Sequence, residues 1–231
     1  MIDQHTICAI STAPGSGAIA VVRLSGNEAI AITDKIFYSI KQGKKLSDQK
    51  ANTIHFGTIR DGETIIDEVV IALFKAPHSF TGEDIVEISC HGSVYIQQTI
   101  LQLLLQNGAR MAQPGEFTRR AFLNGKMDLS QAEAVADVIS ASSEAAHHVA
   151  INQMRGGISS EIKNLRNQLL HFTSLIELEL DFSEEDVEFA NREHLLHLTL
   201  EIDKLIEKLA GSFRYGNAIK NGIPVAIAGD A

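Results

Sequence analysis

Residues 53–74 read TIHFGTIRDGETIIDEVVIALF, and apolar side chains recur in this segment with a period close to two. The runs 53–60 and 64–74 therefore predict two β-strands. Asp61-Gly62 between them is a dipeptide typical of a tight hairpin turn. A hairpin makes its two strands antiparallel, whereas a regular parallel α/β array joins its strands through helices. The segment thus favours an α+β fold.

The residues on either side of the hairpin alternate between strand and helix patterns. Residues 6–11 and 18–24 have strand composition and enclose the small-residue loop 11–17. The glycines of Pro14–Gly17 predict a tight turn where backbone can approach a ligand, and a following strand disfavours a phosphate cradle. We also expect a helix that is capped by Ser25 or Asn27 and reaches about Tyr38. A strand is expected over Ile85–Ser89. A second helix is expected over Ser93–Gln106, closed by Gly108.

From Asp128 onward the apolar period becomes helical. Ser130 and Glu133 have the spacing of a capping box, which marks the start of a helix. Two heptad seams follow, with apolar residues at Ile158, Ile162, Leu165, Leu169, Phe172 and Ile176, and at Leu195, Leu198, Ile202, Leu205 and Leu209. These patterns predict three long amphipathic helices that form an incomplete bundle. The acidic run from Glu177 to Glu188 between the seams is predicted to be a loop.

Charge divides the chain at the same place. Residues 1–126 hold 12 Lys and Arg against 12 Asp and Glu, so the net charge of −9 resides in residues 127–231. We expect three parts: an N-terminal α+β domain over 1–125, a helical domain over 126–218, and the start of a nucleotide-binding domain over 219–231. An acidic chain binds nucleic acid poorly in a nonspecific way, so RNA would need a local patch or a partner.

The last residues, Gly222 to Gly229, form an apolar strand pattern that runs into a glycine. A phosphate-binding loop begins in this way, but the chain has no loop lysine after Gly229. We therefore expect this fragment to lack GTPase activity. No apolar run reaches the roughly eighteen residues that span a bilayer, and no signal peptide is evident. With only Cys8 and Cys90, we expect reduced thiols and a cytoplasmic location without membrane contact.

Three segments resemble the MnmE/TrmE family of tRNA-modifying GTPases. They are TICAISTAPGSGAIAVVRLSG at 6–26, APHSFTGED at 76–84 with its continuation through Glu87 to His91-Gly92, and PGEFTRRAFLNGKMDL at 114–129. The acidic LDFSEED at 180–186 and the terminal strand agree with the resemblance. The match covers most of the chain, in the family's order.

The resemblance implies a folate-binding N-terminal domain that also forms homodimers, a helical domain, and an inserted potassium-dependent GTPase domain. It implies that GTP, K+ and Mg2+ bind only in the full-length protein. Together with a flavoprotein partner, family members form an aminomethyl-type group on C5 of the wobble uridine of tRNA. The carbon comes from a tetrahydrofolate derivative (5-formyl or 5,10-methylene), and the matching positions for its binding are Arg23, Glu87 and Lys126.

The chemistry of these three residues suits a reduced folate. A carboxylate such as Glu87 can accept hydrogen bonds from adjacent N–H groups of a pterin. Arg23 and Lys126 can pair with the carboxylates of the glutamate tail, and the sequence leaves open which of them does so. His91 is a further candidate for the pocket. Cys90 is interpreted as a core residue, and we assign no catalytic residue and no metal ligand.

Two other functions compete with this hypothesis. The chain could be an interaction module that only dimerises and relays the nucleotide state to partners. It could also be a stand-alone folate-dependent enzyme resembling the aminomethyltransferases, although no complete acid–base set is present. Saturable binding of a reduced folate separates the first alternative from the folate hypothesis.

Overall fold

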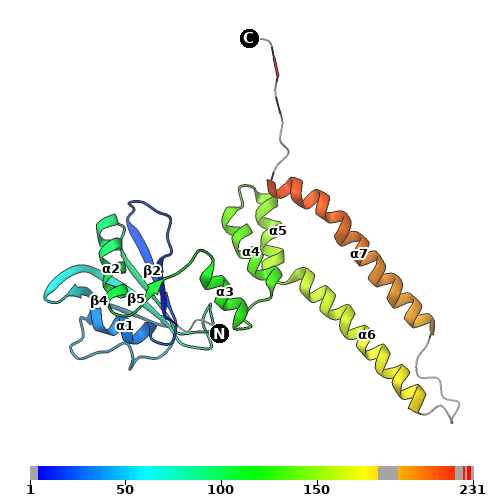
Figure 1. Ribbon diagram of the computed structural model, residues 1–231, viewed down its shortest axis with the longest axis horizontal. Coiled ribbons are helices and arrows are strands. Elements are labelled where there is room, and N and C mark those ends of the chain that lie inside the picture. Colours follow the sequence, from blue (N-terminus) through cyan, green and yellow to red (C-terminus); the bar gives the residue numbers. More distant parts are fainter. Residues whose placement is uncertain (1–4, 182–191, 222–225, 227, 230–231) are drawn as a thin grey trace. The chain divides into compact units, whose positions relative to one another are not determined.

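The computed structural model describes residues 5–181, 192–221, 226 and 228–229. The chain divides into two compact units, residues 1–127 and residues 128–231 (Figure 1). Each unit has its own buried apolar cluster. The mixture of one sheet with helices confirms the predicted α+β class. The predicted first strand of a nucleotide-binding domain lies largely outside the described residues.

The N-terminal unit is built on a seven-stranded sheet of order β3-β4-β5-β6-β2-β1-β7. All neighbouring strands are antiparallel except β1 and β7. The strands are β1 (Ile7–Ile10), β2 (Ile19–Ser25), β3 (Phe37–Ser39), β4 (Thr53–Asp61), β5 (Thr64–Phe74), β6 (Ile85–His91) and β7 (Arg110–Met111), and the helices are α1 (Ala29–Ile36), α2 (Val94–Gln106) and α3 (Glu116–Leu123).

The β4–β5 hairpin matches the prediction for both strands, but its turn is one residue further on. Asp61 pairs with Thr64, so Gly62 and Glu63 form the two-residue loop. Gly62 has φ of +57°, which is the left-handed conformation that such a loop requires and that glycine adopts without strain.

One face of the sheet carries the core of this unit. Helices α1 and α2 pack on it, and side chains such as Leu24, Ile71, Ile88, Ile100 and Leu104 are completely buried. Each such side chain contributes about 1.5–3 kcal/mol when it leaves water. The helices are amphipathic because apolar residues recur every three to four positions, as at Ile100 and Leu104 of α2.

The opposite face of the sheet, here called the open face, is not covered by α1 or α2. Because side chains alternate along a strand, the residues between the buried positions point to this face. Ile54 and Phe56 of β4 and Val70 of β5 are exposed there by 73%, 47% and 38%. The open face therefore combines apolar side chains with charged residues of β2 and β6, which are described below.

Two local predictions for the first helix of the N-terminal unit were wrong. Neither Ser25 nor Asn27 caps α1, whose N-cap is Glu28 without a side-chain hydrogen bond. Ser25 instead ends β2, where its hydroxyl bonds to Thr81 and Glu83. The helix ends at Ile36, and Phe37–Ser39 become an edge strand because they pair with β4. Pairing with a distant strand is a tertiary effect that local helix spacing does not reveal.

The helical unit contains four described helices rather than three: α4 (Leu129–Ser140), α5 (Glu144–Met154), α6 (Gly157–Asp181) and α7 (Arg192–Asn221). The capping box uses Asp128 and Gln131, not Ser130 and Glu133. Both pairs have the required spacing, but the helix begins two residues earlier. Ser143 accepts a hydrogen bond from the Ala146 N–H and so starts a separate helix, α5.

Helices α6 and α7 lie side by side within this unit and share a small apolar cluster (Figure 1). Phe172 and Leu198 are its buried members, and both belong to the predicted heptad seams. The prediction that the acidic run is a loop was wrong for its first part, because Glu177 to Asp181 continue α6. Glu177 and Asp181 are exposed and Glu179 is half-buried, which a helix tolerates while its apolar face remains packed. The rest of the run lies outside the described residues.

Candidate functional site

Arg23 and Glu87 form an ion pair on the open face. They are direct cross-strand partners on β2 and β6, so the antiparallel register places both side chains on one face. The Arg23 Nε and Nη2 atoms donate to Glu87 Oε1 at 2.8 and 2.6 Å. Each side chain is about a quarter exposed, at 28% and 26%. The pair is thus partly shielded from water yet open to a ligand.

Two aromatic rings flank the Arg23 guanidinium. Its central carbon lies 5.7 Å from the ring centroid of Phe80 and 5.7 Å from that of Phe117. Phe80 belongs to the 75–84 loop between β5 and β6, and Phe117 belongs to α3. A cation this close to two ring faces is held by their quadrupoles. Side chains from four segments of the chain therefore meet around one ion pair.

Lys126 lies against the same 75–84 loop. Its Nζ donates to the Pro77 carbonyl oxygen at 2.9 Å. At Gly82, with φ of +79°, an added Cβ would lie 3.3 Å from the Lys126 side chain. The structure therefore joins Arg23 to Glu87 directly. Lys126 follows α3 and contacts the loop that supplies Phe80, and its hydrogen bond is to Pro77 of that loop and not to Arg23 or Glu87.

A buried charge cluster fixes this loop and α3 to each other. It consists of Glu83, Arg110, Glu116 and Arg120, and the Glu116 side chain is completely buried. Arg120 donates to Glu83 at 3.0 and 3.1 Å and to the His5 carbonyl oxygen at 2.7 Å. Because Glu83 is three residues from Phe80 and Glu116 is next to Phe117, the cluster positions both rings beside Arg23.

Glu116 has a strongly perturbed pKa. It accepts hydrogen bonds from Arg110 at 2.6 and 2.9 Å and from the Gln113 N–H at 2.8 Å. The hydrogen bond from Arg110 is the largest cause that lowers the pKa of Glu116 to about 2, and it outweighs burial, which acts in the opposite direction. Glu116 is therefore ionised at every physiological pH.

The sequence did not single out the aromatic and buried charged residues around Arg23. Phe80, Phe117, Glu83, Glu116 and Arg120 all lie within the quoted segments, but α3 itself was not predicted. Glu116 and Arg120 have the i, i+4 spacing of a helical ion pair, and this was the available signal. Their burial depends on contacts with β7 and the 75–84 loop, which only the fold supplies.

The small-residue loop 11–17 is hydrogen-bonded to the backbone at Gly92, just after β6. The Gly17 N–H donates to the Gly92 carbonyl oxygen at 3.0 Å, and the Gly92 N–H donates to Ala18 at 3.2 Å. A Cβ at Gly92 would collide with the Gly17 backbone. Beside this loop is a hollow of about 320 Å³ lined by Ile10, Thr12, Pro14, Gly15, Val94, Gln97 and Gln98. Its lining has no charged side chain.

His91 is hydrogen-bonded to Asp67, and the two cysteines are buried. The His91 Nδ1 lies 2.7 Å from Asp67 Oδ1, and the His91 backbone N–H donates to Asp67 Oδ2 at 2.8 Å. The hydrogen bond with Asp67 raises the pKa of His91. Cys90 is buried in the core, as predicted, and so is Cys8. Burial raises the pKa of each thiol to about 11, which makes both poor nucleophiles.

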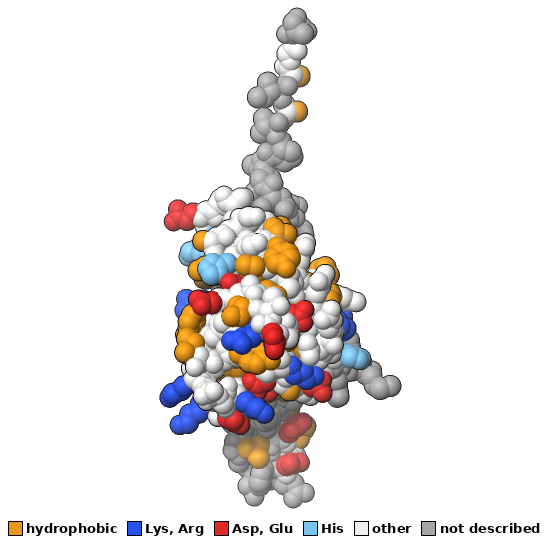
Figure 2. All heavy atoms as spheres, turned by 90° about the vertical axis from the view of Figure 1, so that its left-hand side faces the viewer, with side chains coloured by type: hydrophobic (Ala, Val, Ile, Leu, Met, Phe, Trp, Pro, Cys, Tyr) orange, Lys and Arg blue, Asp and Glu red, His pale blue; other side chains and the backbone are white. Residues whose placement is uncertain are grey.

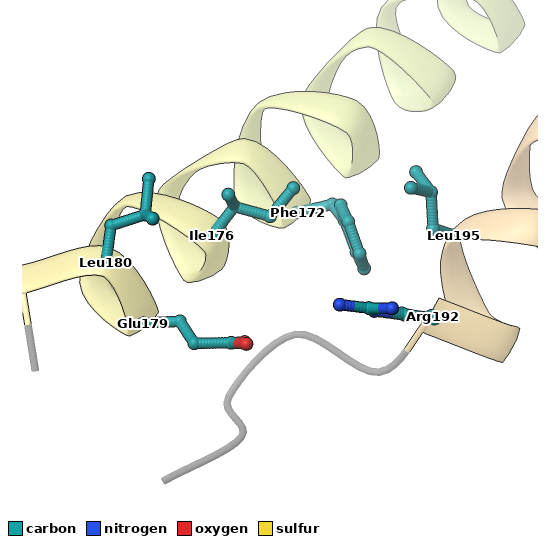
Figure 3. A pocket seen from close by; sticks show the side chains of 6 residues that line it. All are labelled: Phe172, Ile176, Glu179, Leu180, Arg192 and Leu195. Carbon is teal, nitrogen blue, oxygen red and sulfur yellow. The ribbon is translucent and has the colours of Figure 1, made fainter. Parts of the chain in front are cut away.

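A second hollow, of about 430 Å³, lies between the end of α6 and the start of α7. Figure 3 shows its lining, in which Phe172, Ile176, Leu180 and Leu195 are apolar and Glu179 and Arg192 are charged. Residues 182–191, which connect the two helices, lie outside the described residues. We assign this hollow no ligand.

The fold and the candidate site define an α+β domain with a partly buried arginine–glutamate pair, followed by a helical domain. Comparison with known proteins gives the same division. The profile described as "GTP-binding protein TrmE N-terminus" matches residues 6–126, and the profile described as "MnmE helical domain" matches residues 129–224. The chain belongs to the MnmE/TrmE family.

Curated relatives named tRNA modification GTPase MnmE are similar over nearly the whole chain. Those from Bacteroides thetaiotaomicron and Parabacteroides distasonis are 63% identical, over 99% and 98% of this chain. The relative from Flavobacterium johnsoniae is 60% identical over 100% of it. The chain spans about half the length of these relatives, at 49%, 50% and 49%. Among the described helices, none is long and apolar enough to cross a membrane.

Proposed function

We propose that this chain is part of a tRNA-modifying GTPase whose N-terminal unit binds a tetrahydrofolate derivative. In the proposed reaction the full-length protein acts with a flavoprotein partner to form the (carboxymethyl)aminomethyl group on C5 of a wobble uridine. The folate supplies the one-carbon unit when it is bound. The single observation that carries the proposal is the Arg23–Glu87 pair on the open face, flanked by Phe80 and Phe117.

The residues present fit a reduced folate. Glu87 uses Oε1 for Arg23, so its Oε2 can accept from the adjacent N–H donors of a pterin. The neighbouring guanidinium can donate to a carbonyl or carboxylate oxygen of the same ligand. Phe80 and Phe117 offer apolar surface for a planar ring. Lys126 is on the adjoining loop, where its ammonium can pair with a tail carboxylate.

The other parts of the proposal rest on family membership. GTP, K+ and Mg2+ are proposed ligands of the full-length protein, and tRNA and the flavoprotein are its proposed substrate and partner. The names of the relatives support GTP hydrolysis and tRNA modification as the class of activity. We expect a protein with these activities to be cytoplasmic.

Homodimerisation through the N-terminal unit is also proposed. The support is the exposed apolar group Ile54, Phe56 and Val70 on the open face. Covering such side chains removes apolar surface from water. Sedimentation equilibrium of the chain and of Phe56→Ser is the measurement. Equal masses for the two proteins would show that this face does not hold a dimer together.

Calorimetric titration with 5-formyl-tetrahydrofolate tests the folate site. Glu87→Gln keeps the size of the side chain but removes its charge, and loss of a hydrogen bond to a charged group costs about 1.5–3 kcal/mol. The Kd should rise by about tenfold to a hundredfold. Glu68→Gln, at an exposed position of β5, is the matched control and should bind normally. No saturable heat with the unaltered chain would favour the interaction module instead.

A further inference from the structure

The positive charge of the N-terminal unit is concentrated in one segment. Residues 35–60 contain six of its twelve Lys and Arg residues and a single acidic residue, Asp48. These cations are Lys35, Lys41, Lys44, Lys45, Lys50 and Arg60. The Lys35 Nζ donates to the Asn107 carbonyl oxygen at 3.3 Å, and we call the other five the basic surface. The rest of the chain is strongly acidic. A local excess of positive charge in an acidic protein marks a place where a polyanion can bind.

The loop that carries most of these lysines is held firmly to the core. Asp34 of α1 accepts hydrogen bonds from the Leu46 N–H at 2.6 Å and the Ser47 N–H at 2.9 Å. The Leu46 side chain is 1% exposed, and the Lys75 Nζ donates to the Ser47 carbonyl oxygen at 3.3 Å. A loop already fixed in this way loses little further conformational entropy when it binds a partner.

The lysines point outward from this fixed loop. Lys41, Lys45 and Lys50 are exposed. Lys44 is close enough to His55 for its charge to lower the pKa of that imidazole, after the larger effect of burial. Figure 2 faces this end of the N-terminal unit and shows Lys and Arg side chains gathered toward the lower margin, with some acidic side chains among them.

An aromatic ring is present on the edge strand β3, which directly precedes the lysine-bearing loop in the sequence. Arg60 of β4 lies over the ring of Tyr38 of β3, with its central guanidinium carbon 4.9 Å from the ring centroid. Its Nε also donates to the Thr58 hydroxyl at 3.0 Å, which fixes the plane of the guanidinium. Tyr38 remains 46% exposed. Tyrosine rings and guanidinium planes are surfaces on which unpaired RNA bases stack.

We infer that the basic surface binds the phosphate backbone of the tRNA, with Tyr38 and Arg60 contacting an unpaired nucleotide. This inference rests on the proposed function, because it takes tRNA to be the substrate. Compact ammonium groups neutralise phosphates and release condensed counterions, which gives affinity without sequence selectivity. Lysine is depleted at protein–protein interfaces, so this composition favours RNA over a protein partner.

The test is binding of tRNA to the 231-residue chain, measured by fluorescence anisotropy at several salt concentrations. The variant Lys41→Gln/Lys45→Gln/Lys50→Gln removes three exposed charges; the hydrogen bonds that Lys45 and Lys50 make through backbone carbonyls remain. Each lost phosphate contact should reduce the slope of log affinity against log salt by about 1. The Kd at moderate salt should rise by about tenfold to a hundredfold. Tyr38→Leu should weaken binding by about tenfold without changing the slope.

Lys163→Gln/Lys204→Gln/Lys208→Gln is the matched control, because it removes the same charge from exposed helical positions. It should leave the salt slope unchanged. The inference is overturned if the unaltered chain does not bind tRNA at low salt, or if both triple variants behave alike. A variant that changes sedimentation but not tRNA binding would make this surface a protein interface.

Folate titration of the same samples separates the two proposals. Normal folate binding by the Lys41→Gln/Lys45→Gln/Lys50→Gln variant is expected, because none of its residues touches the Arg23–Glu87 pair. Absence of folate binding in the unaltered chain would refute the folate site and leave the tRNA result standing. An unchanged salt slope would refute the basic surface alone.

Discussion

Replacing Glu116 with Gln tests the buried charge cluster that positions α3 and the 75–84 loop. The amide has nearly the size of the carboxylate but has no charge to offer to Arg110 and Arg120. A pKa lowered from 4.5 to about 2 corresponds to at most about 3.4 kcal/mol of stabilisation, at about 1.36 kcal/mol for each tenfold change in proton affinity. Because Arg110 is 31% exposed, water screens part of this, and we expect about 2 kcal/mol.

The loss of stability in Glu116→Gln should appear both in local hydrogen exchange and in the unfolding of the whole N-terminal unit. Hydrogen exchange of backbone amides in residues 110–123 should become about thirtyfold faster, which is the equivalent of about 2 kcal/mol in opening free energy. Scanning calorimetry should show the N-terminal unit unfolding about 6–10 °C lower at neutral pH. Glu63→Gln, at the exposed tip of the β4–β5 hairpin, is the matched control and should unfold like the unaltered chain.

The stabilisation by Glu116 should depend on pH. The pKa of Glu116 is lower in the folded state than in the unfolded state, so its contribution is present above pH 4.5. It is lost as the pH falls from 4.5 through about 2, because the unfolded chain then binds the proton first. The difference in unfolding free energy between the unaltered chain and Glu116→Gln should therefore be smaller at about pH 2.5 than at neutral pH. If this difference in unfolding free energy stayed constant from neutral pH to about pH 2.5, the ionic origin of the stabilisation would be refuted.

Three further outcomes follow from particular contacts. Gly92→Ala should destabilise the N-terminal unit by about 2 kcal/mol or more in urea unfolding, because its Cβ meets the Gly17 backbone, whereas Gly211→Ala in open space should be neutral or stabilising. In an NMR titration the pKa of His91 should lie above the unperturbed value of 6.5, and in Asp67→Asn it should return toward 6.5. The stabilisation from the His91–Asp67 pair is present below pH 6.5 and is lost as the pH rises through the raised pKa of His91. An unshifted pKa of His91 in the unaltered chain would contradict the contact. Cys8 and Cys90 should not react with a thiol reagent at pH 7.5 until denaturant is added, and rapid labelling of the native chain would show that the core admits solvent.

Local patterns in the sequence were sufficient for much of the secondary structure. The alternation in residues 64–74 and the glycine-terminated segment 93–106 match β5 and α2 within a residue, because strand pleat and helix period act over a few neighbours. The quoted segments identified the family from the sequence alone. The sequence also located the acidic half of the chain, since charge is additive along it.

Tertiary structure decided what lies between those elements. Phe37–Ser39 became a strand because β4 offers an edge to pair with, although their own spacing continued a helix. Glu116 and Arg120 are buried because α3 closes against β7 and the 75–84 loop, and burial of a charge depends on partners distant in sequence. The meeting of Arg23, Glu87, Phe80 and Phe117 likewise requires strand register, which is set by long-range pairing and not by any one segment.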